Sequence, residues 1–116
     1  MRPREDTALL RDMLDYARRA AAAVGTRSRK DLDADPVLAA GLERFLEVIG
    51  GAASRLSDET RAAAPRVPWR EIIAMRNRLV HGYFAVDHDI LWTVVHDDVP
   101  GLISELEKLA ENDTAI

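Results

Sequence analysis

Apolar residues recur along most of this chain at the three- and four-residue spacing of an amphipathic helix, and strand-like alternation is nearly absent. The only cluster of β-branched residues is "WTVVHDDV" at 92–99. No internal repeat or low-complexity tail interrupts the pattern. The sequence therefore predicts an all-α protein, a small up-and-down helical bundle in a single domain over residues 1–116.

The first helix is predicted from about Arg4 to Val24. Its apolar stripe consists of Leu9, Leu10, Met13, Ala17 and Ala20. Gly25 provides a stop signal, because glycine at a helix C-terminus accepts the left-handed conformation that ends the helix. The stretch "TRSRKDLDAD" at 26–35 is then interpreted as a short polar connection.

The second helix is predicted to begin after Asp35, a good N-cap residue, with Pro36 at its first position. It runs to about Leu56 despite two glycines at 50 and 51. Ser57 followed by "DET" predicts a further N-cap and a short helical turn, which "AAAPRVP" at 62–68 closes.

A third main helix is predicted from Pro68–Trp69, and it carries the unusual stretch "MRNRLVHGYF" at 75–84. The last segment runs from about Asp87, an N-cap candidate, to about Asn112. A bend is expected at Pro100, because the proline ring removes one backbone hydrogen bond.

Drawn at about 100° per residue, the helix from Trp69 separates its side chains into faces. The apolar arc has two sides, formed by Ile72, Met75 and Leu79 and by Trp69, Ile73 and Val80. Arg76 falls in the middle of this arc, and Tyr83 lies almost directly over it. Asn77 and His81 share the opposite, polar face with Arg70 and Ala74.

A guanidinium on an apolar arc needs a partner, because arginine keeps its proton when buried. Two interpretations remain open: Arg76 pairs with a carboxylate such as Glu47, or it opens onto a cleft or a subunit interface. His81 can equally be an ordinary surface residue and Tyr83 a residue at the edge of the core. Arg76 and His81 stand about 140° apart on a regular helix. Gly82 or a second copy across a two-fold axis would be needed to bring them together.

Composition narrows the class of protein. The 116 residues are 47% hydrophobic and 31% charged, as in a globular domain, and there is no cysteine, which favours a reducing, cytoplasmic environment. We expect neither a signal peptide nor a membrane span. The formal net charge is −4, so the molecule as a whole does not attract nucleic acid. Arginines around the 75–84 stretch nevertheless allow a local basic surface, with solvated helix faces as the simpler alternative.

If Arg76 and His81 converge, their chemistry suits cleavage of RNA, which brings its own 2′-hydroxyl nucleophile. Histidine titrates near neutral pH and can move the protons, while arginine offers a fork of donors to phosphate oxygens. Asn77 can hold a phosphate oxygen, a base edge or the imidazole. Neither a metal nor another cofactor is required. The His and Asp residues at 87–98 are metal-ligand types, but Asp87 fits better as an N-cap and the others as helix-end charges.

The spacing Arg-x4-His-x-Tyr in "RNRLVHGY" resembles the signature of HEPN-domain proteins, in particular the HepT family. "LEVIGGAASRLSDE", "PRVPWREIIAMRNRLVHGYFAVDHDILW" and "DDVPGLISELE" also resemble HepT segments in order and spacing, and together they cover most of residues 42–107. A lone R-x4-H would be a weak signal, whereas the longer match is specific.

The resemblance implies a homodimeric helical bundle whose two motifs line a shared cleft. It implies the toxin of a type VII toxin–antitoxin pair, a metal-independent RNA endonuclease. Arg76 and His81 would be catalytic, and Asn77 would be the polar second residue of the motif. Tyr83 would be modified with AMP by the cognate antitoxin, a minimal nucleotidyltransferase (MNT).

One position departs from the family pattern. Family members commonly read "IGEAA" where this chain has "IGGAA", so that Gly51 replaces a usual glutamate. If that carboxylate orients the histidine or pairs with the arginine, activity is weakened here unless Glu47 substitutes for it. A separate, alternative prediction is a non-catalytic module that binds and restrains a nucleotidyltransferase.

Overall fold

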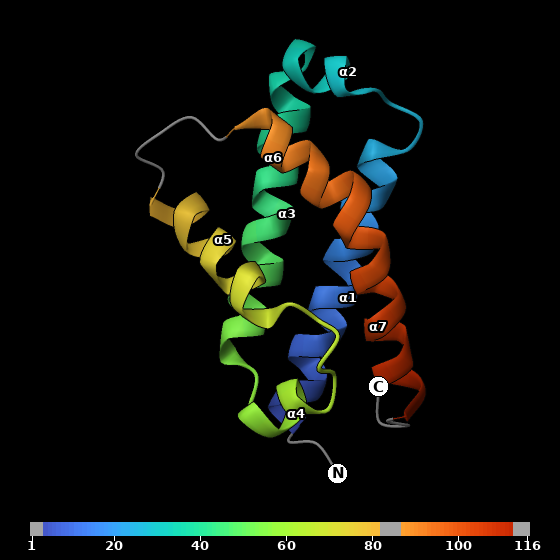
Figure 1. Ribbon diagram of the computed structural model, residues 1–116, viewed down its shortest axis with the longest axis vertical. Helices are drawn as coiled ribbons and strands as arrows, with labels where there is room; N and C mark the ends of the chain where they lie inside the picture. The colour runs from blue at the N-terminus through green and yellow to red at the C-terminus, as the bar shows by residue number, and fades with distance from the viewer. Residues whose placement is uncertain (1–3, 82–86, 113–116) are drawn as a thin grey trace.

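The computed structural model describes residues 4–81 and 87–112, and over these ranges the regular structure is entirely helical (Figure 1). In chain order the elements are α1 (Arg4–Val24), α2 (Arg29–Ala34), α3 (Pro36–Arg55), α4 (Asp58–Ala62), α5 (Trp69–His81), α6 (His88–Thr93), the π-helix η1 (Val94–Asp98) and α7 (Val99–Asn112). The predicted all-α bundle is confirmed.

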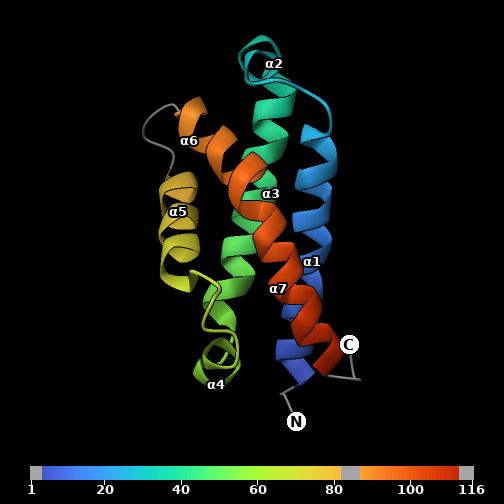
Figure 2. The ribbon, with the colours of Figure 1, turned by 45° about the vertical axis from the view of Figure 1, so that its right-hand side comes forward.

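Helix α3 lies at the centre of the bundle, with α1 packed along one side and α5 along another (Figures 1 and 2). Helix α7 packs on α1. Among the described helices, α3 is the one neighbour along which α5 packs extensively. The helix that carries the motif is therefore attached to the bundle mainly through α3.

The start and stop signals act where the sequence predicted them. Gly25 follows α1 with a φ of 48°, in the left-handed region that glycine occupies without strain. The side chain of Asp35 accepts hydrogen bonds from the backbone N–H groups of Val37 and Leu38, both at 3.1 Å. The stripe predicted for α1 is buried, with Met13, Ala17 and Ala20 fully enclosed.

The stretch at 26–35 is more than the polar connection that the sequence suggested, and that interpretation is wrong. It contains α2, which begins after Ser28, whose backbone N–H donates to the Asp31 carboxylate at 2.7 Å. Leu32 is completely buried and fixes this short helix to the core. A single leucine among charged residues gives no helical period, so the pattern of apolar positions could not reveal it.

Helix α2 is also joined to the start of α6. The Arg29 guanidinium contacts Asp33 and Asp89, both at 2.9 Å, and the Asp33 carboxylate lies 2.7 Å from Nδ1 of His88. The hydrogen bonds with His88 and Arg29 hold the pKa of Asp33 below its ordinary value. These contacts of Asp33 therefore stabilise the folded protein fully at pH values above the ordinary pKa of the carboxyl. That stabilisation is lost as pH falls through the lower pKa of the folded state. This cluster holds the chain just beyond the motif.

The predicted bend at Pro100 takes the form of a π-helical turn. Proline has no N–H to give to the carbonyl four residues earlier, and its ring crowds that carbonyl. The chain widens over Val94–Asp98, where the N–H of Val99 bonds to the carbonyl of Val94, five residues back. α6, η1 and α7 therefore follow one another without a loop (Figure 1).

A buried carboxylate joins the two ends of the α1–α4 region. Asp6 is 3% exposed and accepts hydrogen bonds from the hydroxyls of Ser57, at 2.6 Å, and Thr60.

Replacing Asp6 with asparagine keeps the size of the side chain but puts an N–H₂ group or a weaker acceptor against these two hydroxyl donors. We expect Asp6→Asn to lower the free energy of unfolding by about 1 kcal/mol, measured by urea denaturation. Asp12→Asn, on the exposed side of α1, is the control, and an equal effect of both would contradict this role.

Candidate active site on helix α5

Helix α5 begins at a fixed point of the chain. The indole N–H of Trp69 donates to the carbonyls of Arg61, at 3.0 Å, and Ala64, at 3.1 Å, which ties the start of α5 to the end of α4. Glu71 in the first turn and Arg78 in the last have the charges that the helix dipole favours. The helix therefore presents its C-terminal turn, which holds most of the motif, from an anchored base.

The predicted faces of α5 are confirmed, with one qualification. Arg70, Ala74, Asn77 and His81 all lie on the exposed face. On the inner arc only Leu79 is fully buried, while Ile72, Ile73 and Met75 are half-buried and Val80 is 48% exposed. An apolar arc that is this incompletely covered indicates that α5 has further surface available for contacts.

Arg76 lies where α5 comes closest to α3. A Cβ atom added to Gly50 would be 2.2 Å from Cβ of Arg76, 2.8 Å from its Cγ and 3.1 Å from the carbonyl oxygen of Ile72. Glycine at position 50 therefore permits the contact, and any other residue would push the helices apart. Sequence reasoning noted Gly50 only as a weak point in a helix, although small residues in a helical pattern are a known signal of close helix approach.

The guanidinium of Arg76 extends from this contact towards solvent. Its Nη1 donates to Oδ1 of Asn77 at 3.3 Å. The suggested ion pair with Glu47 is wrong, since Glu47 instead binds Arg44 at 3.2 Å. In the described residues no carboxylate pairs with Arg76, and its side chain is half-buried. The second interpretation, an arginine that opens onto a cleft or interface, is the one this geometry supports.

Gly51 also faces this arginine. A Cβ atom at position 51 would lie 3.8 Å from Nε of Arg76, an ordinary contact distance with room for a longer side chain. A glutamate here would reach the guanidinium, so the departure from the family pattern removes a possible partner of Arg76. Glu47 does not replace it, because it binds Arg44.

His81 is the last residue of α5 and is exposed. Because the helix is regular from Trp69 to His81, the side chains of Arg76 and His81 leave it about 140° apart. Gly82, which could change this direction, and Tyr83 lie outside the described residues. The structure thus brings Asn77 to Arg76 within one chain, and the meeting of Arg76 with His81 stays a prediction.

The surface around the motif is rich in guanidinium groups. Arg70 and Arg78 are exposed on α5 beside the half-buried Arg76. Within residues 4–81 and 87–112, neither forms an ion pair with a carboxylate. The exposed arginines leave both interpretations of the arginine cluster open, a local basic surface and solvated helix faces on an acidic protein.

Most of the histidines and aspartates beyond the motif have structural partners, and Asp98 is the exception among those described. Asp87 caps α6 through the N–H groups of Asp89 and Ile90, as predicted. His88 binds Asp33, and His96 binds Asp97 at 2.7 Å and stacks on Trp92. The described part of the chain contains no group of three or more His, Cys, Asp or Glu side chains arranged to hold a metal ion.

One known protein family has a model that matches most of this chain. A model of the family described as "Ribonuclease HepT-like" matches residues 13–109, which include the whole of α3 and α5 and the second half of α1. The chain belongs to the HepT-like ribonuclease family.

Individual relatives of this HepT-like protein are named as ribonucleases, in agreement with the family. A protein named probable ribonuclease HepT from Thermococcus cleftensis is 42% identical over 66 residues, 57% of this chain and 60% of its own length. A candidate RNase from Caldanaerobacter subterraneus subsp. tengcongensis is 36% identical over 86 residues, 74% of this chain and 77% of its own length. A candidate RNase from Methanocaldococcus jannaschii is 42% identical over 64 residues, 55% of this chain and 59% of its own length.

The HepT-like chain thus spans about three-fifths of the length of the first and third of these relatives. No solved structure matches it. Within the described residues, no helix is long and apolar enough to cross a membrane.

Proposed function

We propose that this HepT-like protein is a metal-independent RNA endonuclease, the toxin of a type VII toxin–antitoxin pair in the cytoplasm, and that Arg76 and His81 are its reactive pair. The observation that supports this most directly is the environment of Arg76. Its stem is fixed against Gly50, and its guanidinium reaches solvent beside Asn77 without a carboxylate partner in the described residues. A guanidinium held in this way is available for a phosphate.

In the proposed reaction the imidazole of His81 takes the proton of the RNA 2′-hydroxyl, whose oxygen then attacks the adjacent phosphorus. The bond to the 5′-oxygen breaks, and that oxygen receives a proton from a second imidazole. The guanidinium of Arg76 and the amide of Asn77 bind the non-bridging oxygens, on which negative charge accumulates. No step requires a group beyond these side chains and the RNA.

A homodimer would supply the second imidazole and close the angular gap between Arg76 and His81. The exposed face of α5 carries Asn77 and His81, with Val80 48% exposed beside them. Pairing this face across a two-fold axis would cover Val80 and place the Arg76 of one protomer near the His81 of the other. The proposed active site is therefore a cleft shared by two copies.

Cleavage should survive removal of divalent ions. We expect purified protein to cut single-stranded RNA at the same rate with and without EDTA, because His81 and Arg76 perform the roles that a metal would otherwise have. Product analysis by gel and mass spectrometry would show internal cuts. Cleavage that stops in EDTA and returns with Mg²⁺ or Mn²⁺ would reject metal independence. Products released only from one end would reject the endonuclease assignment.

Tyr83 is proposed as the site of silencing by an MNT-type antitoxin that binds this protein. A transferred AMP group is bulky and negatively charged. If Tyr83 lies over Arg76, as the helical wheel of the sequence predicts, that group would exclude RNA both by its volume and by repulsion of phosphate. Co-expression with the neighbouring nucleotidyltransferase should add whole AMP units to the intact mass, located on Tyr83 by peptide mapping. Tyr83→Phe should remain unmodified and active, and modification at another residue would contradict the assignment.

One observation favours the alternative, a non-catalytic module that binds a nucleotidyltransferase. Gly51 faces Arg76, so the position at which the resemblance implies a glutamate supplies no carboxylate to this guanidinium. The two functions separate when the chain is expressed alone: a nuclease toxin arrests growth and cleaves RNA, whereas a binding module does neither at any concentration.

A further inference from the structure

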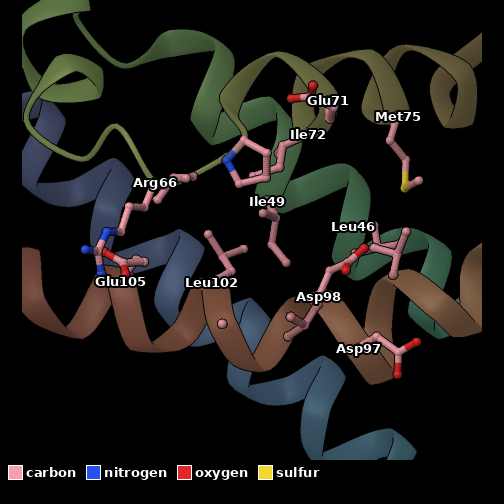
Figure 3. A pocket seen from close by; sticks show the side chains of 15 residues that line it. Leu46, Ile49, Arg66, Glu71, Ile72, Met75, Asp97, Asp98, Leu102 and Glu105 are labelled. Atoms are coloured by element: carbon pink, nitrogen blue, oxygen red, sulfur yellow. The ribbon is translucent and has the colours of Figure 1, made fainter.

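An apolar groove lies beside the motif helix, between α5 and the η1–α7 segment. Its volume is about 450 Å³, and its floor belongs to α3. The apolar lining includes Leu46, Ile49, Ile72, Met75, Val99 and Leu102. Figure 3 shows Ile49, Ile72 and Leu102 pointing into the space between the two helical walls. The groove exists because α5 and α7 pack on other helices of the bundle and not extensively on one another.

The shape of this groove fits a helix. Its wall on the η1–α7 segment extends from Val94 to Glu105, which at 1.5 Å per residue is roughly 16 Å, or about three helical turns. The opposite wall, on α5, includes Glu71, Ile72 and Met75. A trough with two helical walls and an apolar floor accepts an amphipathic helix whose apolar residues recur at every third or fourth position.

The charges of the groove are mainly negative. Four carboxylates line it, those of Glu71, Asp97, Asp98 and Glu105, against the single guanidinium of Arg66. Asp97 lies beside His96 at 2.7 Å and Glu105 beside Lys108 at 3.3 Å, so these two are partly compensated. In the described residues Glu71 and Asp98 have no ion-pair partner. Arg66 and Glu105 lie towards one end of the groove and Asp97 towards the other (Figure 3).

We propose that this groove binds a basic amphipathic helix of a partner protein, with leucine-like residues against Ile72 and Leu102 and Lys or Arg residues against Glu71 and Asp98. A second copy of this chain is disfavoured, because a two-fold contact through the groove would bring the same carboxylates face to face. The groove also lies on a different side of α5 from Asn77 and His81, so a bound helix leaves the exposed face of the motif open.

Two glycines give a matched steric test. A Cβ atom at Gly101, which lines the groove, meets nothing within 4 Å, and the same is true at Gly41 on α3, which does not line it. A side chain can therefore start from either glycine without a clash at Cβ, and only the phenylalanine of Gly101→Phe stands on the proposed docking surface. Circular dichroism would verify that both variants remain folded.

The probe is a synthetic peptide of about four helical turns, with leucines at i, i+3, i+4, i+7 and i+11 and lysines on both flanks. Its binding to the full-length protein is measured by fluorescence anisotropy. We expect Gly101→Phe to weaken binding by at least about tenfold and Gly41→Phe to leave it unchanged. Failure of the peptide to bind, or equal effects of the two variants, would overturn the proposal.

Charge exchange tests the chemistry of the partner. The same peptide with glutamate in place of lysine should bind the wild-type protein poorly and should gain affinity for the double variant Glu71→Lys/Asp98→Lys. The control variant Asp12→Lys/Glu111→Lys changes the net charge equally on exposed sites that do not line the groove. Equal binding of both peptides, or a gain with the control variant, would reject a basic partner.

Sedimentation of the Gly101→Phe protein tests the remaining occupant, a second copy of this chain. Loss of the dimeric state in this variant would show that a second copy occupies the groove and would also overturn the proposal.

Discussion

His81→Ala is expected to lower the rate of RNA cleavage by about 10²–10⁴-fold, the usual contribution of a positioned acid or base. His81 is exposed at the end of α5, so the substitution should leave the fold intact. The measurement is the initial rate on a fluorescently labelled RNA, with circular dichroism as a test of folding. Full activity in a folded His81→Ala protein would reject the assignment.

Arg76 should behave similarly, with a distinctive response to lysine. Arg76→Lys retains the charge but loses the planar fork that matches two phosphate oxygens, so it should recover only a small part of the activity that Arg76→Ala loses. Arg78→Ala is the matched control, because Arg78 is an exposed guanidinium two residues further along the same helix. Equal losses from Arg76→Ala and Arg78→Ala would indicate a diffuse basic surface instead of a defined site.

Mixing the two inactive proteins tests the shared cleft. If Arg76 of one protomer works with His81 of the other, a dimer of Arg76→Ala with His81→Ala contains one cleft in which both groups are present. Co-refolding the two variants should then restore a small part of the activity, because this cleft keeps Arg76 and one His81 but lacks the second imidazole, so that the 5′-oxygen must take its proton from water. If each site were built within one chain, no mixture of the two would cleave RNA.

Gly50→Ala is expected to destabilise the protein by roughly 3 kcal/mol, although alanine is the better helix former. The added methyl group would lie 2.2 Å from Cβ of Arg76 and 3.1 Å from the carbonyl of Ile72, so α5 as a whole must move. Because α3 is the main partner of α5 among the described helices, the position of the motif depends mainly on this contact. Cleavage activity should therefore fall together with stability.

The neighbouring glycine supplies the control for this substitution. At Gly51 a Cβ atom has an ordinary 3.8 Å contact with Nε of Arg76, so Gly51→Ala should raise the free energy of unfolding by about 0.5–1 kcal/mol. The free energy of unfolding of both variants would be measured by urea denaturation monitored by circular dichroism. If Gly50→Ala stabilised the protein as Gly51→Ala does, α5 would not depend on the close approach at Arg76.

The sequence predicted those parts of the fold that local chemistry determines. Gly25 and Asp35 mark helix ends by their own backbone and side-chain hydrogen bonds, so they could be recognised without knowledge of the rest. Helix α2 was not predicted. Its stability comes from the burial of Leu32 in the core and from contacts of Arg29 and Asp33 with α6, a segment far along the chain. Contacts between residues far apart in the chain leave no period in the sequence.

The same distinction applies to the candidate site. The helical wheel placed Arg76 and His81 on different faces of α5, and the structure confirms this. The wheel could not choose between Glu47 and solvent as the environment of Arg76, because that depends on how α3 and α5 meet at Gly50. The groove beside α7 was likewise not foreseen, since its walls come from segments that are distant in sequence.

The π-helical turn before Pro100 has a consequence for how the C-terminal helix tolerates changes in length. Leu91, Val95 and Val99 are all buried although they follow one another at intervals of four, a spacing that a regular α-helix would gradually turn away from the core. The wider turn of η1 takes up this drift, and α7 then continues with buried Leu102 and Leu106. The segment thus holds one residue more than an α-helical path requires, and deleting His96 would let the turn tighten while the leucines beyond it keep their phase.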